Sequence, residues 1–298
     1  MEKIEKYRKL AKIVQYCGMI IIVLVGMFLL YWLGFKNVTE NSTMTTLSIL
    51  LATIMALFLF LTAVGAPMQS KLLKLIILES LNGLVSEVKF NRKKGYSKES
   101  FLKLNLVNDN FAQYGCTDYY SFVYKDQLIE STTVRAFDEI KIAKQKGKKG
   151  SKTVKKTINH FFGRIYIIPY ASESKFNIYG KKIPDISRKK ELSEKEYNIE
   201  LPLKFKKYNE NFEVFYKNEK PTNNILSLLD KLYVLRLQAK GPVSLFVRKN
   251  TMVLCIDNAH HYAEVEIKNP IDETMVKNYR KDVSMVLAFI NAIHKMEE

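Results

Sequence analysis

The sequence predicts an α+β protein: an N-terminal two-helix transmembrane hairpin, followed by a cytoplasmic domain with a mainly antiparallel sheet and packing helices. Two observations carry this prediction. Two long uncharged stretches lie near the N-terminus, and a helix needs about 20 apolar residues to cross the hydrocarbon core of a bilayer. Farther along, short runs of aromatic and β-branched residues alternate with polar turns and helical patterns, which is typical of strands packed by helices.

The first uncharged stretch is Ile13–Phe35, and Tyr31 and Trp32 near its end favour the membrane interface. It is longer than the apolar core of a signal peptide, roughly 7–15 residues, and no small-residue cleavage site follows it. The second stretch has its apolar core at Leu47–Met68. The predicted segments are a basic cytoplasmic tail at 1–12, transmembrane helices at 13–35 and 47–69, and a short external loop at 36–46.

The lysines and arginines beside the two spans predict the orientation of the hairpin, because such residues stay on the cytoplasmic side. The loop between the spans contains only Lys36. We therefore expect a multi-pass protein of the cell (inner) membrane with both termini in the cytoplasm. The flanking basic residues are Lys3, Lys6, Arg8, Lys9 and Lys12 before the first span, and Lys71, Lys74, Lys89, Arg92, Lys93 and Lys94 after the second.

A juxtamembrane helix is predicted over residues 70–95. One face of it carries an apolar stripe with spacings of three and four residues, which suits a helix. The stripe either packs on the rest of the domain or joins two copies of the chain into a homo-oligomer, as heptad-like seams do. Its members are Leu73, Ile77, Leu81, Leu84 and Val88.

The cytoplasmic α+β domain is predicted over residues 96–298. It begins with a short helix and a loop at Tyr96–Tyr114 and contains a helix at Asn223–Gln238 that ends before Gly241 and Pro242. Asn269 and Pro270 suit the start of a last helix that ends near Lys295. The predicted strands are Tyr119–Tyr124, Ile129–Phe137, Phe161–Tyr170, Phe176–Tyr179, Phe212–Tyr216, a hairpin of Val243–Arg248 and Thr251–Asp257, and His261–Ile267.

The strongest local feature is the segment Lys141–Lys156, KIAKQKGKKGSKTVKK, which contains no acidic residue. We predict a mobile loop between two strands that is either a solvated connection or a contact for anionic lipid, where each lysine contributes up to about 1 kcal/mol. Nucleic acid is the disfavoured partner because no aromatic side chain interleaves with the lysines. The candidate lipid contacts are Lys141, Lys144, Lys146, Lys148, Lys149, Lys152, Lys155 and Lys156.

No catalytic, cofactor-binding or metal-binding residue is predicted. Gly147 and Gly150 are three residues apart and no lysine follows the second one, so the segment does not match a phosphate-binding loop. His260 and His261 are adjacent, and adjacent residues of a strand point to opposite faces, which disfavours one shared metal ion.

The remaining reactive side chains are expected to be structural. We interpret the three carboxylates around the second predicted strand as solvated charges near strand ends, and the cysteines, which form no CxxC pair, as lone buried thiols in a reducing compartment. The carboxylates are Glu130, Asp138 and Glu139, and the cysteines are Cys17, Cys116 and Cys255.

Five blocks rich in Phe, Tyr and Gly follow one another in the second part of the chain: GYSKESFLKLNLV, YGCTDYYSFVYKDQLIESTTVRAFDEI, HFFGRIYIIPY, FEVFYKNEKPTNNILSLLDKL and VSLFVRKNTMVLCIDNAHHYAEVEI. Together they resemble a bacterial membrane protein family, the domain of unknown function 3137, and the resemblance covers about residues 90–295. It implies one or two N-terminal spans before the domain, and it brings no catalytic motif. The block FEVFYKNEKPTNNIL lacks the Ala-Arg-Tyr expected there. Gene neighbourhoods of the family make another membrane protein, of the LemA family, a candidate partner.

Three functional hypotheses follow. The first is a non-enzymatic, membrane-anchored adaptor or scaffold that binds a protein partner or anionic lipid, in keeping with the formal net charge of +17. The second is a membrane-associated enzyme or ligand sensor without a recognisable motif. The third is a membrane protein that binds nucleic acid non-specifically. Whether the protein is an enzyme stays open, and the first hypothesis is preferred.

Overall fold

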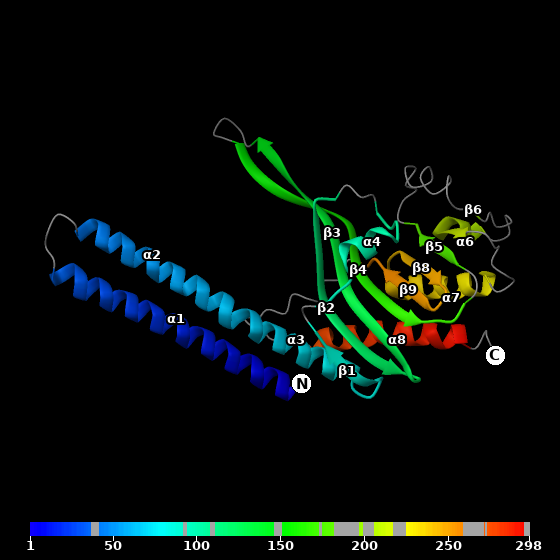
Figure 1. Ribbon diagram of the computed structural model, residues 1–298, viewed down its shortest axis with the longest axis horizontal. Helices are drawn as coiled ribbons and strands as arrows, with labels where there is room; N and C mark the ends of the chain where they lie inside the picture. Colours follow the sequence, from blue (N-terminus) through cyan, green and yellow to red (C-terminus); the bar gives the residue numbers. More distant parts are fainter. Residues whose placement is uncertain are drawn as a thin grey trace. The chain divides into compact units, whose positions relative to one another are not determined.

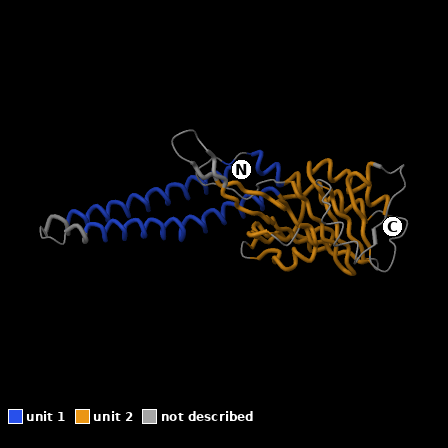
Figure 2. The backbone as a smooth tube through the Cα atoms, turned by 90° about the horizontal axis from the view of Figure 1, so that it is seen from above, with its two compact units in different colours: residues 1–80, 262–279 blue, residues 81–261, 280–298 orange. Residues whose placement is uncertain are grey.

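The computed structural model describes residues 1–36, 42–91, 94–107, 111–145, 151–172, 175–181, 197–198, 206–216, 225–258, 271 and 273–294. The chain divides into two compact units, which Figure 2 shows in two colours. Unit 1 comprises residues 1–80 and 262–279, and unit 2 comprises residues 81–261 and 280–298. Each unit has its own packing.

Unit 1 is built on a pair of long helices. These are α1 (Glu2–Lys36) and α2 (Ser42–Phe60), and α2 continues through a π-helical turn (Leu61–Gly65) into α3 (Ala66–Leu81). Gly18 of α1 faces the ring of Phe60, and Gly26 faces the side chain of Thr53 on α2. These two facing pairs run in opposite directions along the two helices, so α1 and α2 are antiparallel. Small residues at the contact let the two backbones approach closely, as in many membrane helix pairs.

The helices of unit 1 expose most of their large apolar side chains, including Leu24, Phe28, Leu51 and Phe58. Two helical segments, Glu2–Trp32 and Thr46–Leu81, are long and apolar enough to cross a membrane. The first segment covers the predicted span 13–35 as far as Trp32, and the second covers the whole predicted span 47–69. The predicted tail at 1–12 is itself helical, because α1 begins at Glu2.

The helix predicted over 70–95 is shorter than expected. α3 ends at Leu81, and Gly83 adopts a positive φ of 74°, a conformation that commonly terminates helices. Ser86–Phe90 then forms strand β1 and pairs with β2, so these residues belong to the sheet and not to the helix that the apolar stripe predicted. Leu73 and Ile77 are buried within a single chain, which favours the interpretation that the stripe packs inside the protein.

Unit 2 contains an antiparallel sheet whose nine described strands follow the order β1-β2-β3-β4-β9-β8-β5-β7-β6 (Figure 1). Aromatic and β-branched residues dominate the central strands, as expected for a pleated surface that is covered by side chains. The strands beyond β1 are β2 (Gln113–Tyr124), β3 (Gln127–Gln145), β4 (Ser151–Pro169), β5 (Phe176–Gly180), β6 (Tyr197–Asn198), β7 (Phe212–Tyr216), β8 (Val243–Arg248) and β9 (Thr251–Ile256).

Most of the predicted elements are confirmed, with shifted ends. The β8–β9 hairpin turns at Lys249 and Asn250, and the pairs Leu245↔Leu254 and Val247↔Met252 give the predicted shared apolar face. The strand predicted at His261–Ile267 and the helix start at Asn269 and Pro270 lie outside the described residues. The helices of this part of the chain are α4 (Lys98–Leu102), α6 (Lys206–Asn211), α7 (Ile225–Ala239) and α8 (Glu273–His294).

Helices and loops cover both faces of the sheet. On one face, α8 buries Val283, Val286 and Ile290, and its Asn291 Nδ2 donates to the Tyr124 hydroxyl at 2.7 Å. Tyr124 pairs with Gln127 of β3, and Val134 lies seven residues farther along that strand, so Val134 points to the opposite face of the sheet. There it joins a core that contains Phe101 of α4. This arrangement confirms the α+β class with an antiparallel sheet and packing helices.

Strands β4 and β9 come unusually close at Gly163. A β-carbon at this position would coincide with the carbonyl oxygen of Ile256 and crowd the backbone of Asp257. Immediately beside it, the Phe162 N–H donates to Asp257 Oδ1 at 3.1 Å. Glycine is therefore required here by the approach of another backbone.

Candidate functional site

The most distinctive surface feature of unit 2 is a two-stranded ribbon, defined here as residues 138–145 of β3 paired with residues 151–158 of β4. β2 pairs with β3 only up to Phe137, and β9 pairs with β4 only from Arg164 onward. No other described strand pairs with the ribbon. Figure 1 shows these ends of β3 and β4 extending past the neighbouring strands of the sheet.

The ribbon corrects the loop predicted at Lys141–Lys156. The backbone pairs Lys141↔Lys155 and Lys144↔Lys152 place most of this segment in an antiparallel ladder. The β-branched residues Ile140, Ile142, Thr153 and Val154 favour strands, whereas lysine does not. Lys141, Lys155 and Lys156 are exposed. Of the candidate lipid contacts, Lys146, Lys148 and Lys149 lie outside the described residues.

The base of the ribbon exposes two large apolar side chains. Ile140 is 42 % exposed and Ile158 is 40 % exposed. Ile140 pairs with Lys156 and Asp138 pairs with Ile158, so both isoleucines and Lys156 lie on one face. Along the ladder the next pair on this register is Ile142↔Val154. The ribbon therefore combines exposed aliphatic residues with exposed lysines.

A polar contact fixes the point where the ribbon leaves the sheet. Asp138 Oδ1 accepts from the Ala112 N–H at 2.6 Å, and Asp138 Oδ2 lies 2.7 Å from His160 Nε2. The hydrogen bond from Ala112, followed by the contact with His160, lowers the pKa of the Asp138 carboxyl. Asp138 therefore links the base of the ribbon to the backbone of Ala112 and to the side chain of His160.

The three carboxylates considered from the sequence do not meet at one site. Glu130 Oε1 accepts from Lys94 Nζ at 2.7 Å and from the Tyr119 hydroxyl at 2.5 Å. Burial favours the neutral acid, but these two bonds outweigh it and lower the pKa of Glu130. The bond to Glu130, with the one to Tyr119, raises the pKa of Lys94 to about 12. Glu139 instead pairs with Lys155 at 3.9 Å.

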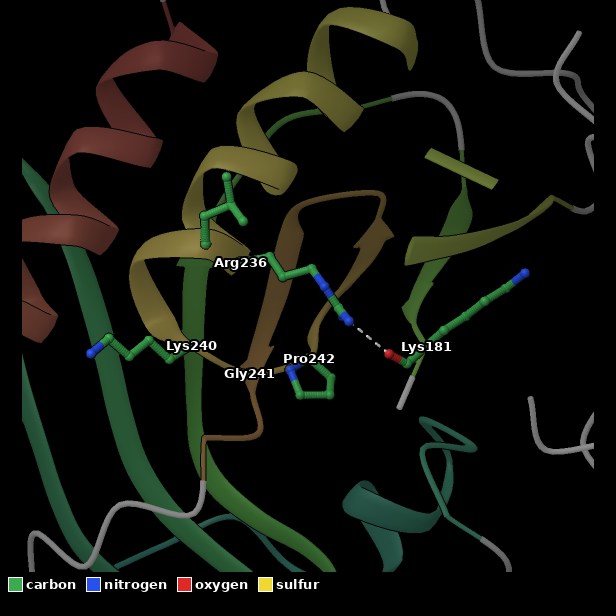
Figure 3. A pocket seen from close by; sticks show the side chains of 6 residues that line it. Lys181, Arg236, Lys240, Gly241 and Pro242 are labelled. Carbon is green, nitrogen blue, oxygen red and sulfur yellow. Dashed lines mark hydrogen bonds between the residues drawn. The ribbon is translucent and has the colours of Figure 1, made fainter. Parts of the chain in front are cut away.

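A surface cavity of about 360 Å³ lies between the end of β5 and the last turn of α7 (Figure 3). It is lined by Lys181, Arg236, Leu237, Lys240, Gly241 and Pro242. In Figure 3 the Arg236 side chain reaches toward Lys181, whose carbonyl oxygen accepts from Arg236 Nη2 at 2.9 Å. Sequence reasoning missed this cavity because its cationic residues are scattered along the chain and only the fold brings them together.

A second missed feature is a buried polar row on the α8-facing side of the sheet. Tyr120, Ser131 and Tyr166 are directly paired across β2, β3 and β4 and are fully buried. Arg164, two residues from Tyr166, is 2 % exposed, and its guanidinium lies 5.2 Å from the centre of the Tyr120 ring. Burial raises the pKa of the Tyr166 hydroxyl well above its ordinary value. Because Tyr119–Tyr124 and Phe161–Tyr170 are rich in aromatic residues, the sequence indicated an apolar face here.

The remaining candidates from the sequence are placed as follows. Cys17, Cys116 and Cys255 are free, as predicted, but the prediction that they are buried holds only for Cys255, because Cys17 is exposed and Cys116 is partly exposed. Burial raises the pKa of Cys255 well above its ordinary value. No group of three metal-ligating side chains occurs among the described residues, and His260 and His261 lie outside them.

Comparison with known proteins gives a family and no activity. No curated protein and no solved structure matches the chain. One family model, described as protein of unknown function (DUF3137), matches residues 149–295. That match includes β4, the central hairpin and α8, whereas the blocks quoted from the sequence began near residue 90. Residues 149–295 therefore belong to the DUF3137 family of unknown function.

Proposed function

We propose that the protein is a non-enzymatic, membrane-anchored adaptor whose ribbon binds the anionic surface of a bilayer. The single observation that carries this proposal is the ribbon itself, a two-stranded extension with exposed lysines and exposed isoleucines. An isolated two-stranded hairpin is only marginally stable in water, so a surface that covers it also stabilises it.

The anchor in this proposal is the pair of long apolar helices in unit 1. The basic residues that flank them, and the single lysine between them, favour a multi-pass protein of the cell (inner) membrane with both termini cytoplasmic. Anionic lipids give the cytoplasmic leaflet a negative surface potential, and this potential attracts basic segments of a cytoplasmic domain. Tethering through the chain raises the effective concentration of the ribbon near that surface.

Charge and apolar contact contribute differently to the proposed binding. Lys155 points to the opposite face of the ribbon, where it pairs with Glu139, whereas Lys156 is exposed on the face of the two isoleucines and contributes up to about 1 kcal/mol next to an anionic leaflet. This part weakens as salt screens the charges. Ile140 and Ile158 add burial of aliphatic surface, which salt does not screen. The geometry therefore predicts binding that falls with salt to a residual level set by the isoleucines.

The test uses the full chain reconstituted in vesicles of neutral phosphatidylcholine, with and without anionic phosphatidylglycerol. Hydrogen–deuterium exchange of the backbone amides in residues 138–158 reports whether the ribbon is covered. We expect slower exchange only with anionic lipid. The double variant Lys155→Gln/Lys156→Gln loses the contribution of Lys156, up to about 1 kcal/mol, so the ratio of covered to free ribbon falls up to about fivefold.

The matched control is Lys125→Gln/Lys249→Gln, which removes two lysines from the turns of the β2–β3 and β8–β9 hairpins. It has the same net charge as the ribbon variant, so any effect of total charge is shared. Equal exchange in neutral and anionic vesicles, or equal behaviour of the two double variants, would refute the proposal. Protection that comes from added duplex DNA in neutral vesicles, and not from anionic lipid, would assign the ribbon to nucleic acid instead.

A further inference from the structure

The first turns of α1 lie beside α3 in unit 1 (Figure 1). The Met1 amino group lies 3.3 Å from Glu79 Oε1, and Lys71 Nζ lies 4.9 Å from the centre of the Tyr7 ring. The two contacts advance along α1 and go back along α3, so the helices are antiparallel here. Tyr7 and Lys71 therefore lie at the same level of the helix pair.

Three exposed lysines, defined here as the basic cluster, surround this contact: Lys3, Lys71 and Lys74. Lys71 and Lys74 are three residues apart on α3, and Lys3 lies four residues before Tyr7 on α1. Residues at these spacings are neighbours on a helix surface. No ion pair of these lysines occurs in the described part of the chain, so their positive charges are available to an anion.

The Tyr7 ring gives one of these charges a defined position. The distance of 4.9 Å from Lys71 Nζ to the ring centre is within the range of a cation–π contact, which extends to about 6 Å. Tyr7 is half-buried, so the protein itself holds the ring. The ammonium group of Lys71 is therefore held at the surface of the helix pair, unlike that of a freely rotating lysine.

The neighbouring side of α1 is already occupied by the protein itself. Arg8 is 6 % exposed, and its Nε donates to Glu5 Oε2 at 2.8 Å. Ile4 and Ala11 are buried with it. The charge of Arg8 is thus satisfied within the chain, and the basic cluster is the cationic surface that remains open on this part of unit 1.

Aliphatic surface begins one turn beyond Tyr7. Leu10 is 58 % exposed and Val14 is 38 % exposed, and the spacings of three and four residues place both on the Tyr7 face of α1. Val14 belongs to the first predicted span, whereas Lys3 lies on the other side of Tyr7. The order along this face is lysine, tyrosine and aliphatic residues. A phospholipid has the same order of headgroup, interface and acyl chain, and tyrosine favours the interface.

We infer that the basic cluster binds the headgroup of an anionic phospholipid, with the phosphate beside Lys71 and Lys74 and an acyl chain along Leu10 and Val14. A soluble phosphate ester would use the lysines but would leave the exposed aliphatic residues uncovered, so these residues favour a lipid. The inference rests on the membrane anchor of the proposed function and does not involve the ribbon.

The test is native mass spectrometry of the full chain in micelles of a neutral detergent. The protein is titrated with phosphatidylglycerol or with phosphatidylcholine of the same acyl length. We expect phosphatidylglycerol to bind saturably and more tightly. Each lysine beside an anionic lipid contributes up to about fivefold in affinity, so Lys71→Gln/Lys74→Gln should weaken this binding by up to about 30-fold. Tyr7→Leu keeps the net charge but removes the ring, and should weaken it by up to about fivefold.

The matched control is Lys6→Gln/Lys9→Gln, which also removes two exposed lysines three residues apart. These two lie on the outward face of α1, opposite the buried Ile4 and Ala11, so phosphatidylglycerol should bind as it does to the natural chain. If Tyr7→Leu does not fold, the two double-lysine variants decide. Equal affinity for the two lipids, or equal losses in the two double-lysine variants, overturns the inference.

Two further arms identify the ligand and the site. Displacement of bound phosphatidylglycerol by glycerol 3-phosphate at similar concentration would assign the cluster to a soluble phosphate ester and overturn the lipid assignment. Binding that Lys155→Gln/Lys156→Gln removes and Lys71→Gln/Lys74→Gln leaves intact belongs to the ribbon, and it also overturns the inference. Failure of the ribbon in the exchange experiment leaves binding at the basic cluster unaffected, so the two failures are distinguishable.

Discussion

Replacement of Gly163 by alanine tests the close approach of β4 and β9. The added β-carbon would coincide with the carbonyl oxygen of Ile256, which is a backbone atom and cannot rotate away as a side chain could. To make room, β9 must move away from β4 at the pair Arg164↔Ile256. The same movement strains the bond from the Phe162 N–H to Asp257 Oδ1.

The cost follows from the contacts that must shift. Overpacking a well-packed interior costs about 1–3 kcal/mol. Loss of the hydrogen bond from the Phe162 N–H to Asp257 Oδ1 adds about 1 kcal/mol. We therefore expect Gly163→Ala to lower the free energy of unfolding of the sheet domain by about 2–4 kcal/mol. With an m-value of about 2 kcal/mol/M in urea, the unfolding midpoint falls by about 1–2 M.

The assay is urea unfolding of the full chain in neutral detergent, followed by the circular dichroism of the sheet. The matched control is Gly115→Ala on β2, where a β-carbon would meet nothing within 4 Å. Because glycine weakens a strand interior, this control should leave stability unchanged or raise it by up to about 1 kcal/mol. Equal midpoints for the two variants would refute the reasoning that the approach at Gly163 is tight.

Three further predictions concern other contacts of unit 2. The contacts of Asp138 with Ala112 and His160 lower its pKa, so they stabilise the fold above about pH 4. This contribution is lost as the pH falls through the lowered pKa. In Asp138→Asn the melting temperature, measured at a series of pH values, should therefore fall less steeply on the acid side. Ile290→Ala removes a buried α8 side chain and should cost about 2–5 kcal/mol in urea unfolding, whereas a loss below 1 kcal/mol would contradict the packing of α8. Cys255 is buried with a raised pKa, so alkylation followed by mass spectrometry should modify it only in denaturant.

The parts of the fold that the sequence predicted well are those set by local patterns. The β8–β9 hairpin followed from alternating apolar residues on both sides of Lys249-Asn250, because register in a half-buried hairpin is fixed by that alternation. The juxtamembrane helix was predicted too long because Val88 fits a helical stripe and a strand equally well. Pairing of Lys89 with Ser121 is a long-range contact that no local pattern contains.

The candidate site was predictable only in part. Lysine charge led to the expectation of a loop at 141–156, although Ile140, Ile142 and Val154 alternate with polar residues in the manner of strands. That alternation was the available signal for the ribbon. No sequence pattern predicts the cavity, because Lys181 and Arg236 are brought together only by the packing of α7 beside the end of β5.

The ribbon also has a consequence for the behaviour of the protein at high concentration. Beyond Phe137 on one side and Arg164 on the other, no described strand satisfies its outer backbone donors and acceptors. Such edges recruit other strands, and lysines are a common means of keeping two copies apart by repulsion. Lysine acetylation or high salt would remove that repulsion and favour edge-to-edge fibres. The lysine charges that we propose to contact lipid would then also prevent self-assembly of the protein.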